Sequence, residues 1–238
     1  MRATALVFMS MLAMAGPARA QGGGEWEEYT SRQDGFTLNF PGEPKITDMQ
    51  WTSQFDYTLP GRVYSANRGQ ERYTMTVIDY RPIEQQGIER AKKCPPGNAQ
   101  CRQNAGIMGP GYWMHDVRSA TMFAAFRIVQ RGVKVINLAW EWQDMVEGTM
   151  VQVVNADESR TFGYVAMHEN KLYIIEGTVP KDYPEPGLFQ QSLGWTDSDG
   201  KPMRYQQIIY SNAYHGMGVY PRPPHDLPGA RGGVRPPQ

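Results

Sequence analysis

After its first twenty residues, the 238-residue sequence has no apolar run of about eighteen residues, the length that a helix needs to cross a bilayer. It also lacks an excess of either charge, because 24 basic residues balance 24 acidic ones. Residues 1–20 contain Arg2 and Arg19 but no acid, so the remainder carries 22 basic and 24 acidic residues. We therefore expect neither a membrane span nor nucleic acid as a partner.

Catalytic motifs are missing as well. The sequence has no Gly-x-Ser-x-Gly elbow, no His-Glu-x-x-His pair and no phosphate-binding Gly-rich loop before a lysine. The run Asp197-Ser198-Asp199-Gly200 begins like a calcium loop, but Ile208 stands where the bidentate glutamate belongs, which favours a β-turn. We expect no enzymatic activity, no cofactor and no metal. A hydrolase is a remote alternative, because one sequence does not show whether carboxylates face each other across a cleft.

The first twenty residues are typical of a secretory signal peptide. Arg2 supplies the positive start, residues 3–15 form an apolar run too short to span a bilayer, and small residues lead to Ala20. We expect cleavage after Ala20 and export to the periplasm or out of the cell.

The rest of the chain divides into three predicted segments. Residues 21–29 are expected to be a flexible lead, and residues 30–214 a single α+β domain. Residues 215–238 are rich in proline and glycine, so they have too few apolar side chains to offset the entropy of ordering, and we expect disorder. The spacing of Pro221 and Pro224 would also suit an aromatic groove that binds polyproline, although a solvated tail is the simpler interpretation.

The two cysteines, Cys94 and Cys101, lie in Cys-Pro-Pro-Gly-Asn-Ala-Gln-Cys. In an exported chain this close pair favours a structural disulfide, which would contribute roughly 2 to 3 kcal/mol. A redox pair would need the spacing Cys-x-x-Cys, and a metal site would need two further ligands.

Apolar residues alternate over most of the chain, which predicts strands. The clearest runs are residues 36–40, 63–67, 72–80, 133–142, 150–155, 161–168 and 171–179. In the fourth run, Ile136, Leu138, Trp140 and Trp142 share what we expect to be a buried face. Glu169-Asn170 predicts a tight hairpin between the last two runs.

Helical spacing is limited to three stretches. It predicts helices over residues 83–92, 116–131 and 184–193, and the second half of the middle stretch would also suit a strand. Many strands with few helices, and without regular alternation, indicate an α+β fold with an antiparallel sheet.

Aromatic residues are the main candidates for contact with a ligand or partner. Six are singled out: Trp113, Trp140, Trp142, Trp195, Tyr164 and Tyr173. They would either line a pocket for an apolar or sugar ligand or fill the core between helices and sheet, and their placement on alternating strands favours the core.

Three short stretches resemble the PsbP-like superfamily. They are Asp34-Gly35-Phe36-Thr37-Leu38-Asn39-Phe40-Pro41-Gly42-Glu43-Pro44, Asn170-Lys171-Leu172-Tyr173-Ile174-Ile175 and Leu188-Phe189-Gln190-Gln191-Ser192-Leu193. The resemblance covers about residues 30–195. It implies an antiparallel sheet sandwiched between helices, an α/β/α sandwich, and a class of accessory proteins that are not enzymes.

Taken with the signal peptide, these features predict an exported, non-catalytic accessory or binding protein whose partner is a protein or another component of the cell envelope. The alternative is a carrier that holds a small molecule in an aromatic-lined pocket.

Overall fold

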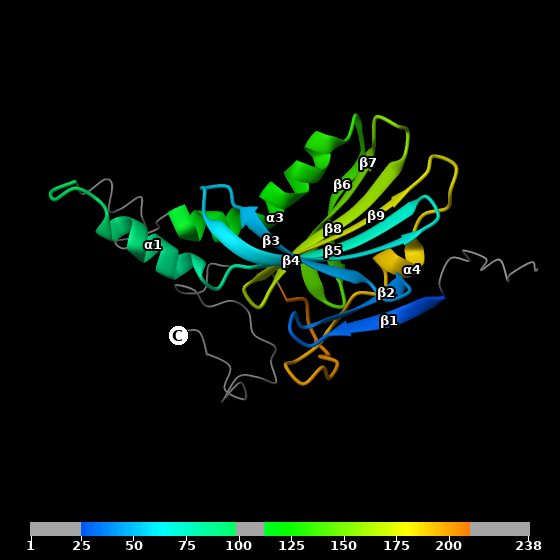
Figure 1. The fold of residues 1–238 in the computed structure, drawn as a ribbon, viewed down its shortest axis with the longest axis horizontal. Coiled ribbons are helices and arrows are strands. Elements are labelled where there is room, and N and C mark those ends of the chain that lie inside the picture. Colours follow the sequence, from blue (N-terminus) through cyan, green and yellow to red (C-terminus); the bar gives the residue numbers. More distant parts are fainter. Residues whose placement is uncertain (1–24, 99–111, 210–238) are drawn as a thin grey trace, which may run out of the picture.

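The computed structural model describes residues 25–98 and 112–209 of the chain. Within these ranges two antiparallel sheets dominate the fold (Figure 1). The large sheet has the order β3-β4-β5-β9-β8-β7-β6 and the small one β1-β2-β10. The large sheet consists of β3 (Lys45–Thr52), β4 (Thr58–Arg68), β5 (Glu71–Asp79), β6 (Lys134–Gln143), β7 (Val146–Val154), β8 (Arg160–His168) and β9 (Lys171–Val179). The small sheet consists of β1 (Trp26–Ser31), β2 (Phe36–Pro41) and β10 (Gly194–Trp195). The helices are α1 (Ile83–Lys92), α3 (Tyr112–Arg131) and α4 (Gly187–Gln190).

Tight turns set the register of the large sheet. Glu169 and Asn170, which join β8 to β9, both have positive φ (46° and 63°), as the predicted hairpin requires. Asp144 and Met145 do the same between β6 and β7, with φ of 42° and 64°. These two-residue loops place β6 beside β7 and β8 beside β9.

One face of the large sheet is covered by α3. The helix packs on β7, β8 and β9, and its apolar side includes Ala120, Ala124 and Ile128, all buried. Gly163 of β8 makes room for this contact, because a Cβ there would come within 3.0 Å of the Ile128 Cδ1 atom. Small side chains thus bring helix and sheet close together.

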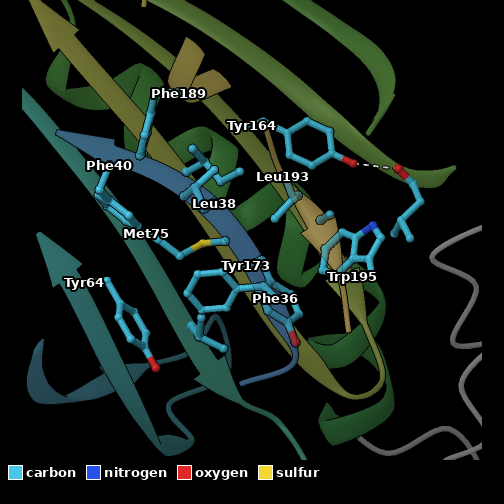
Figure 2. Close-up of a cluster of buried hydrophobic side chains, with 14 of the residues drawn as sticks. Phe36, Leu38, Phe40, Tyr64, Met75, Tyr164, Tyr173, Phe189, Leu193 and Trp195 are labelled. Atoms are coloured by element: carbon cyan, nitrogen blue, oxygen red, sulfur yellow. Dashed lines mark hydrogen bonds between the residues drawn. The ribbon is translucent and has the colours of Figure 1, made fainter. Parts of the chain in front are cut away.

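The other face is covered by the small sheet. Phe36, Leu38 and Phe40 of β2 are fully buried and belong to one cluster with Met75 and Tyr173 of the large sheet (Figure 2). The predicted α/β/α sandwich is therefore wrong for the described residues, where a second sheet and the one-turn helix α4 take the place of a second helical layer. The alternation at residues 36–40 predicted a strand with one buried face, but such a pattern does not say to which sheet the strand belongs.

Several boundaries also differ from expectation. The helix α3 begins at Tyr112, before the predicted start at residue 116. The strand β1 begins at Trp26 and pairs with β2 from Trp26–Pro41 to Ser31–Phe36, so the expected flexible lead is a strand from residue 26 onward. The predicted helix over 184–193 shrinks to Gly187–Gln190, because Pro184 and Pro186 disfavour helical geometry before it. The prediction for α1 is confirmed, since the helix runs from Ile83 to Lys92. Residues 1–20 and 215–238 lie outside the described ranges.

Candidate functional site

The six aromatic residues chosen from the sequence fall into three places. Trp195, Tyr164 and Tyr173 lie together in the buried cluster between the two sheets. Trp113 belongs to α3 and is buried on the opposite face of the large sheet. The last two, Trp140 and Trp142, lie on β6 and are 51% and 46% exposed. The structure therefore does not bring the six into one site.

The buried three fill the core. The Trp195 ring lies 4.3 Å from the His168 ring and 4.9 Å from the Tyr173 ring, centroid to centroid. Their polar tips have partners within the protein: Trp195 Nε1 donates to the Gln143 carbonyl (3.2 Å), Tyr164 Oη to the Val146 carbonyl (2.6 Å) and Tyr173 Oη to the Asp34 carbonyl (2.6 Å). Each of these aromatic groups is packed and hydrogen-bonded without a ligand.

The surface hollows do not involve the six candidates either. Two hollows formed by described residues are lined mainly by polar side chains, and none of the six aromatic residues lines either one. Tyr29 and Tyr64 line the second hollow, beside Arg32 and Arg62.

His168 belongs to the same buried cluster. Its Nε2 atom is hydrogen-bonded to Tyr205 Oη at 2.6 Å. Burial, with a smaller contribution from the charge of Lys171, lowers the pKa of His168 to about 3. The imidazole is therefore neutral at physiological pH, and it is enclosed by aromatic rings rather than presented to a substrate.

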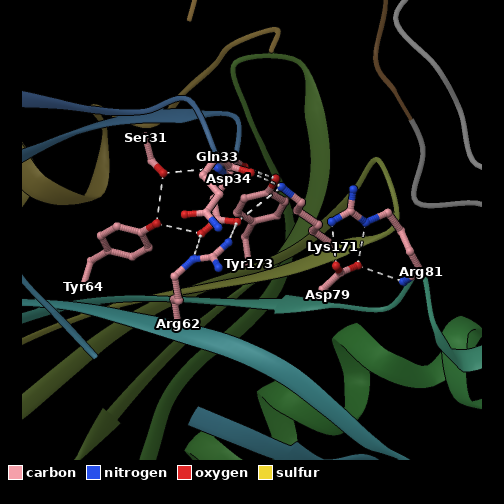
Figure 3. A network of polar contacts seen from close by, with 9 residues as sticks. All are labelled: Ser31, Gln33, Asp34, Arg62, Tyr64, Asp79, Arg81, Lys171 and Tyr173. Carbon is pink, nitrogen blue, oxygen red and sulfur yellow. Dashed lines mark hydrogen bonds and ion pairs between the residues drawn. The ribbon is translucent and has the colours of Figure 1, made fainter. Parts of the chain in front are cut away.

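A charged network centred on Asp34 ties the small sheet to the large one (Figure 3). Asp34 lies in the turn between β1 and β2, where Gly35 has φ of 71°. Its carboxylate accepts hydrogen bonds from Arg62 Nε (2.7 Å) and Tyr64 Oη (2.6 Å), and Lys171 Nζ lies 3.2 Å away. Lys171 also donates to the Gln33 carbonyl at 2.7 Å. One buried carboxylate in the turn of the small sheet thus binds side chains from two strands of the large sheet, β4 and β9.

The charges in this network shift the pKa of Asp34. Burial alone would raise that pKa, but the hydrogen bonds from Arg62 and Tyr64 and the charge of Lys171 outweigh burial and lower it. In turn, burial and the hydrogen bond to Asp34 raise the pKa of Tyr64 to about 12. The sequence reasoning missed this network. Asp34-Gly35 carries a recognisable turn signal, but nothing near Arg62 or Lys171 in the sequence links those residues to it.

The exposed residues of β6 form a distinct surface. We call it the β6 surface and define it by Ile136, Leu138, Trp140 and Trp142, which are 50%, 52%, 51% and 46% exposed. The two tryptophan rings lie 5.0 Å apart between centroids at an angle of 49°. Trp140 Nε1 donates to Glu147 Oε1 at 3.0 Å, which holds that ring over β7.

The sequence placed these four residues on a buried face, and this prediction is wrong. Their alternation was read correctly, because exposed and half-buried side chains alternate from Ile136 to Gln143, whereas Lys134 and Val135, at the start of the strand, are both exposed. However, β6 is the last strand of the large sheet, and α3 packs on β7, β8 and β9. The pattern shows which residues share a face and does not show whether another layer covers it.

An apolar surface of this kind suits recognition. Soluble proteins rarely leave several large apolar side chains together in water, and such patches mark interaction sites. A tilted tryptophan pair offers flat apolar area to a proline, an aliphatic side chain or a sugar ring. As an edge strand, β6 also has backbone groups on the side away from β7.

Other kinds of site find less support in residues 25–98 and 112–209. These residues contain no group of three or more His, Cys, Asp or Glu side chains placed to hold a metal ion. Of the helices found there, none is long and apolar enough to cross a membrane. Cys94 follows α1, but Cys101 lies outside the described residues, so the disulfide stays a prediction.

No family model matches this chain, and no curated protein matches it significantly.

Proposed function

We propose that this protein is an exported, non-catalytic accessory protein that binds a protein component of the cell envelope through the β6 surface. The observation that carries the proposal is the row of four large apolar side chains, each about half exposed, on an edge strand. Tryptophan is among the residues most enriched in protein interfaces and often dominates their binding energy.

The other expected function, a small-molecule carrier, has less support. It needs an aromatic pocket, whereas Trp195, Tyr164 and Tyr173 pack against one another and bond to backbone carbonyls. The resemblance to the PsbP-like superfamily agrees with an accessory role, although the helix-sandwiched fold that it implied is wrong here. The predicted signal peptide supplies the reason to look for the partner in the cell envelope.

The test uses the affinity-tagged chain beginning at Gln21 to capture its partner from an envelope extract. The double variant Trp140→Ser/Trp142→Ser should lose at least about tenfold of the captured partner, because each buried interface tryptophan contributes roughly 2 kcal/mol. The matched control is Leu188→Ser, which changes a side chain that is 60% exposed and belongs to α4. Equal capture by the wild type and the double variant would refute the proposal, provided that circular dichroism shows both to be folded.

A further inference from the structure

The described part of the chain ends at Ile209, which is separated from the β6 surface by the strand β7. Ile209 N donates to the Met145 carbonyl (2.7 Å), and Glu147 N donates to the Ile209 carbonyl (2.9 Å). These bonds place Ile209 beside the start of β7, in a parallel bridge with Val146. The other side of β7 pairs with β6 there, Trp142 opposite Glu147. Ile209 is therefore about two strand spacings, roughly 10 Å, from the end of β6 that carries the tryptophans.

The residues that follow contain a ligand of matching chemistry. After Ile209, the ten residues 210–219 lead to Tyr220-Pro221-Arg222-Pro223-Pro224. Proline fixes φ near the value of the polyproline II helix, so such a segment loses little entropy on binding. Surfaces that bind polyproline are built from exposed aromatic rings. A ten-residue connection reaches up to about 33 Å, which is enough to bring these prolines over Trp140 and Trp142.

Charge also complements the apolar match. Residues 210–238 contain three arginines, Arg222, Arg231 and Arg235, against one acid, Asp226. Beside the tryptophan pair, Glu147 accepts the hydrogen bond from Trp140 Nε1, whereas Asp144, in the turn after β6, is paired with Arg204 and with the backbone N–H of Trp195. Arg222 stands between the prolines, so a docked segment places a guanidinium near the carboxylate of Glu147.

We propose that the β6 surface binds the proline-rich segment 220–228 of the same chain. The inference rests on the proposed function for its surface but does not depend on the external partner. A tether of this length gives an effective concentration of about 1 mM, so a segment that binds with a Kd of about 100 μM occupies the surface roughly nine-tenths of the time. The envelope partner then competes with this segment for the β6 surface, and the segment lowers the apparent affinity of the protein for that partner.

Fluorine NMR of the chain from Gln21, labelled with 5-fluorotryptophan, tests this directly. The signals of the two tryptophans are assigned with Trp140→Phe and Trp142→Phe. The variant Pro221→Ala/Pro223→Ala/Pro224→Ala should shift both signals. It should also increase the change in their chemical shifts when H₂O is replaced by D₂O, while the signal of the buried Trp195 stays in place. The control Pro236→Ala/Pro237→Ala, farther along the same tail, should change none of them.

A synthetic peptide of residues 218–228 completes the experiment. It should return the two signals of the triple variant toward their wild-type positions, and it should bind the wild type at least tenfold more weakly because the attached segment competes. Unchanged signals in the triple variant would overturn the inference. Signals that depend on protein concentration would also overturn it, because the segment would then come from a second copy. If capture of the envelope partner still requires Trp140 and Trp142 in either case, the proposed function stands without the tail.

Discussion

Trp195 and the pair Trp140–Trp142 are the same type of residue in opposite environments. Trp195 lies on a strand of two residues and is 1% exposed, whereas the pair lies on a strand of ten residues and is about half exposed. The difference comes from the covering layers. Trp195 lies between the sheets, while β6 lies beyond the strands on which α3 packs. Burial in this protein is decided by the neighbouring layer and not by the regularity of the strand.

Truncation of the buried and of the exposed tryptophan should give the largest difference in the free energy of unfolding. We expect Trp195→Ala to lower the free energy of unfolding by about 3 to 5 kcal/mol, because it leaves a cavity against His168 and Tyr173. Trp140→Ala should cost less than about 1 kcal/mol, since that ring is half in water already. Urea unfolding followed by circular dichroism measures both. Equal losses would show that the two environments differ less than the exposures indicate.

The Asp34 network should make the next largest contribution to the free energy of unfolding. Asp34→Asn removes the charge between Arg62 and Lys171, and we expect a loss of about 3 kcal/mol at pH 7. The control is Asp79→Asn, which breaks the more exposed pair with Arg81 and should cost less than about 1 kcal/mol.

The pH dependence of Asp34→Asn supplies a second check. Because folding lowers the pKa of Asp34, its contribution is complete above the usual carboxyl range and is lost as the pH falls through the lowered value. The gap between wild type and Asp34→Asn should therefore close in strong acid. A gap that is constant from pH 7 to pH 2 would contradict this account.

His168 should add an effect that is absent at neutral pH and grows gradually in milder acid. Its pKa is about 3 in the folded protein and 6.5 when unperturbed, so the unfolded state binds one more proton between these values. The wild type should lose about 1.4 kcal/mol of stability per pH unit below 6.5. His168→Gln should flatten this slope. Parallel curves for wild type and His168→Gln would refute the assignment.

The sequence predicted the local elements better than their assembly. The helix α1, the strand β5 and the Glu169-Asn170 hairpin follow from spacing and turn chemistry that neighbouring residues provide. The pairing of Trp195 with Phe36 and the contact of Lys171 with Asp34 join residues far apart in the chain. Local patterns contain no information on such contacts, which is why the second sheet and the exposure of β6 were not predicted.

The pairing within the small sheet also constrains the order in which the chain folds. Its middle strand, β2, pairs with β1 at once but gains its other partner only from Trp195. While the protein emerges from the ribosome, the burial of Phe36, Leu38 and Phe40 therefore stays incomplete until residues made much later are available. A partly synthesised chain exposes this apolar side of β2, which makes it a ligand for chaperones until the last strand is in place.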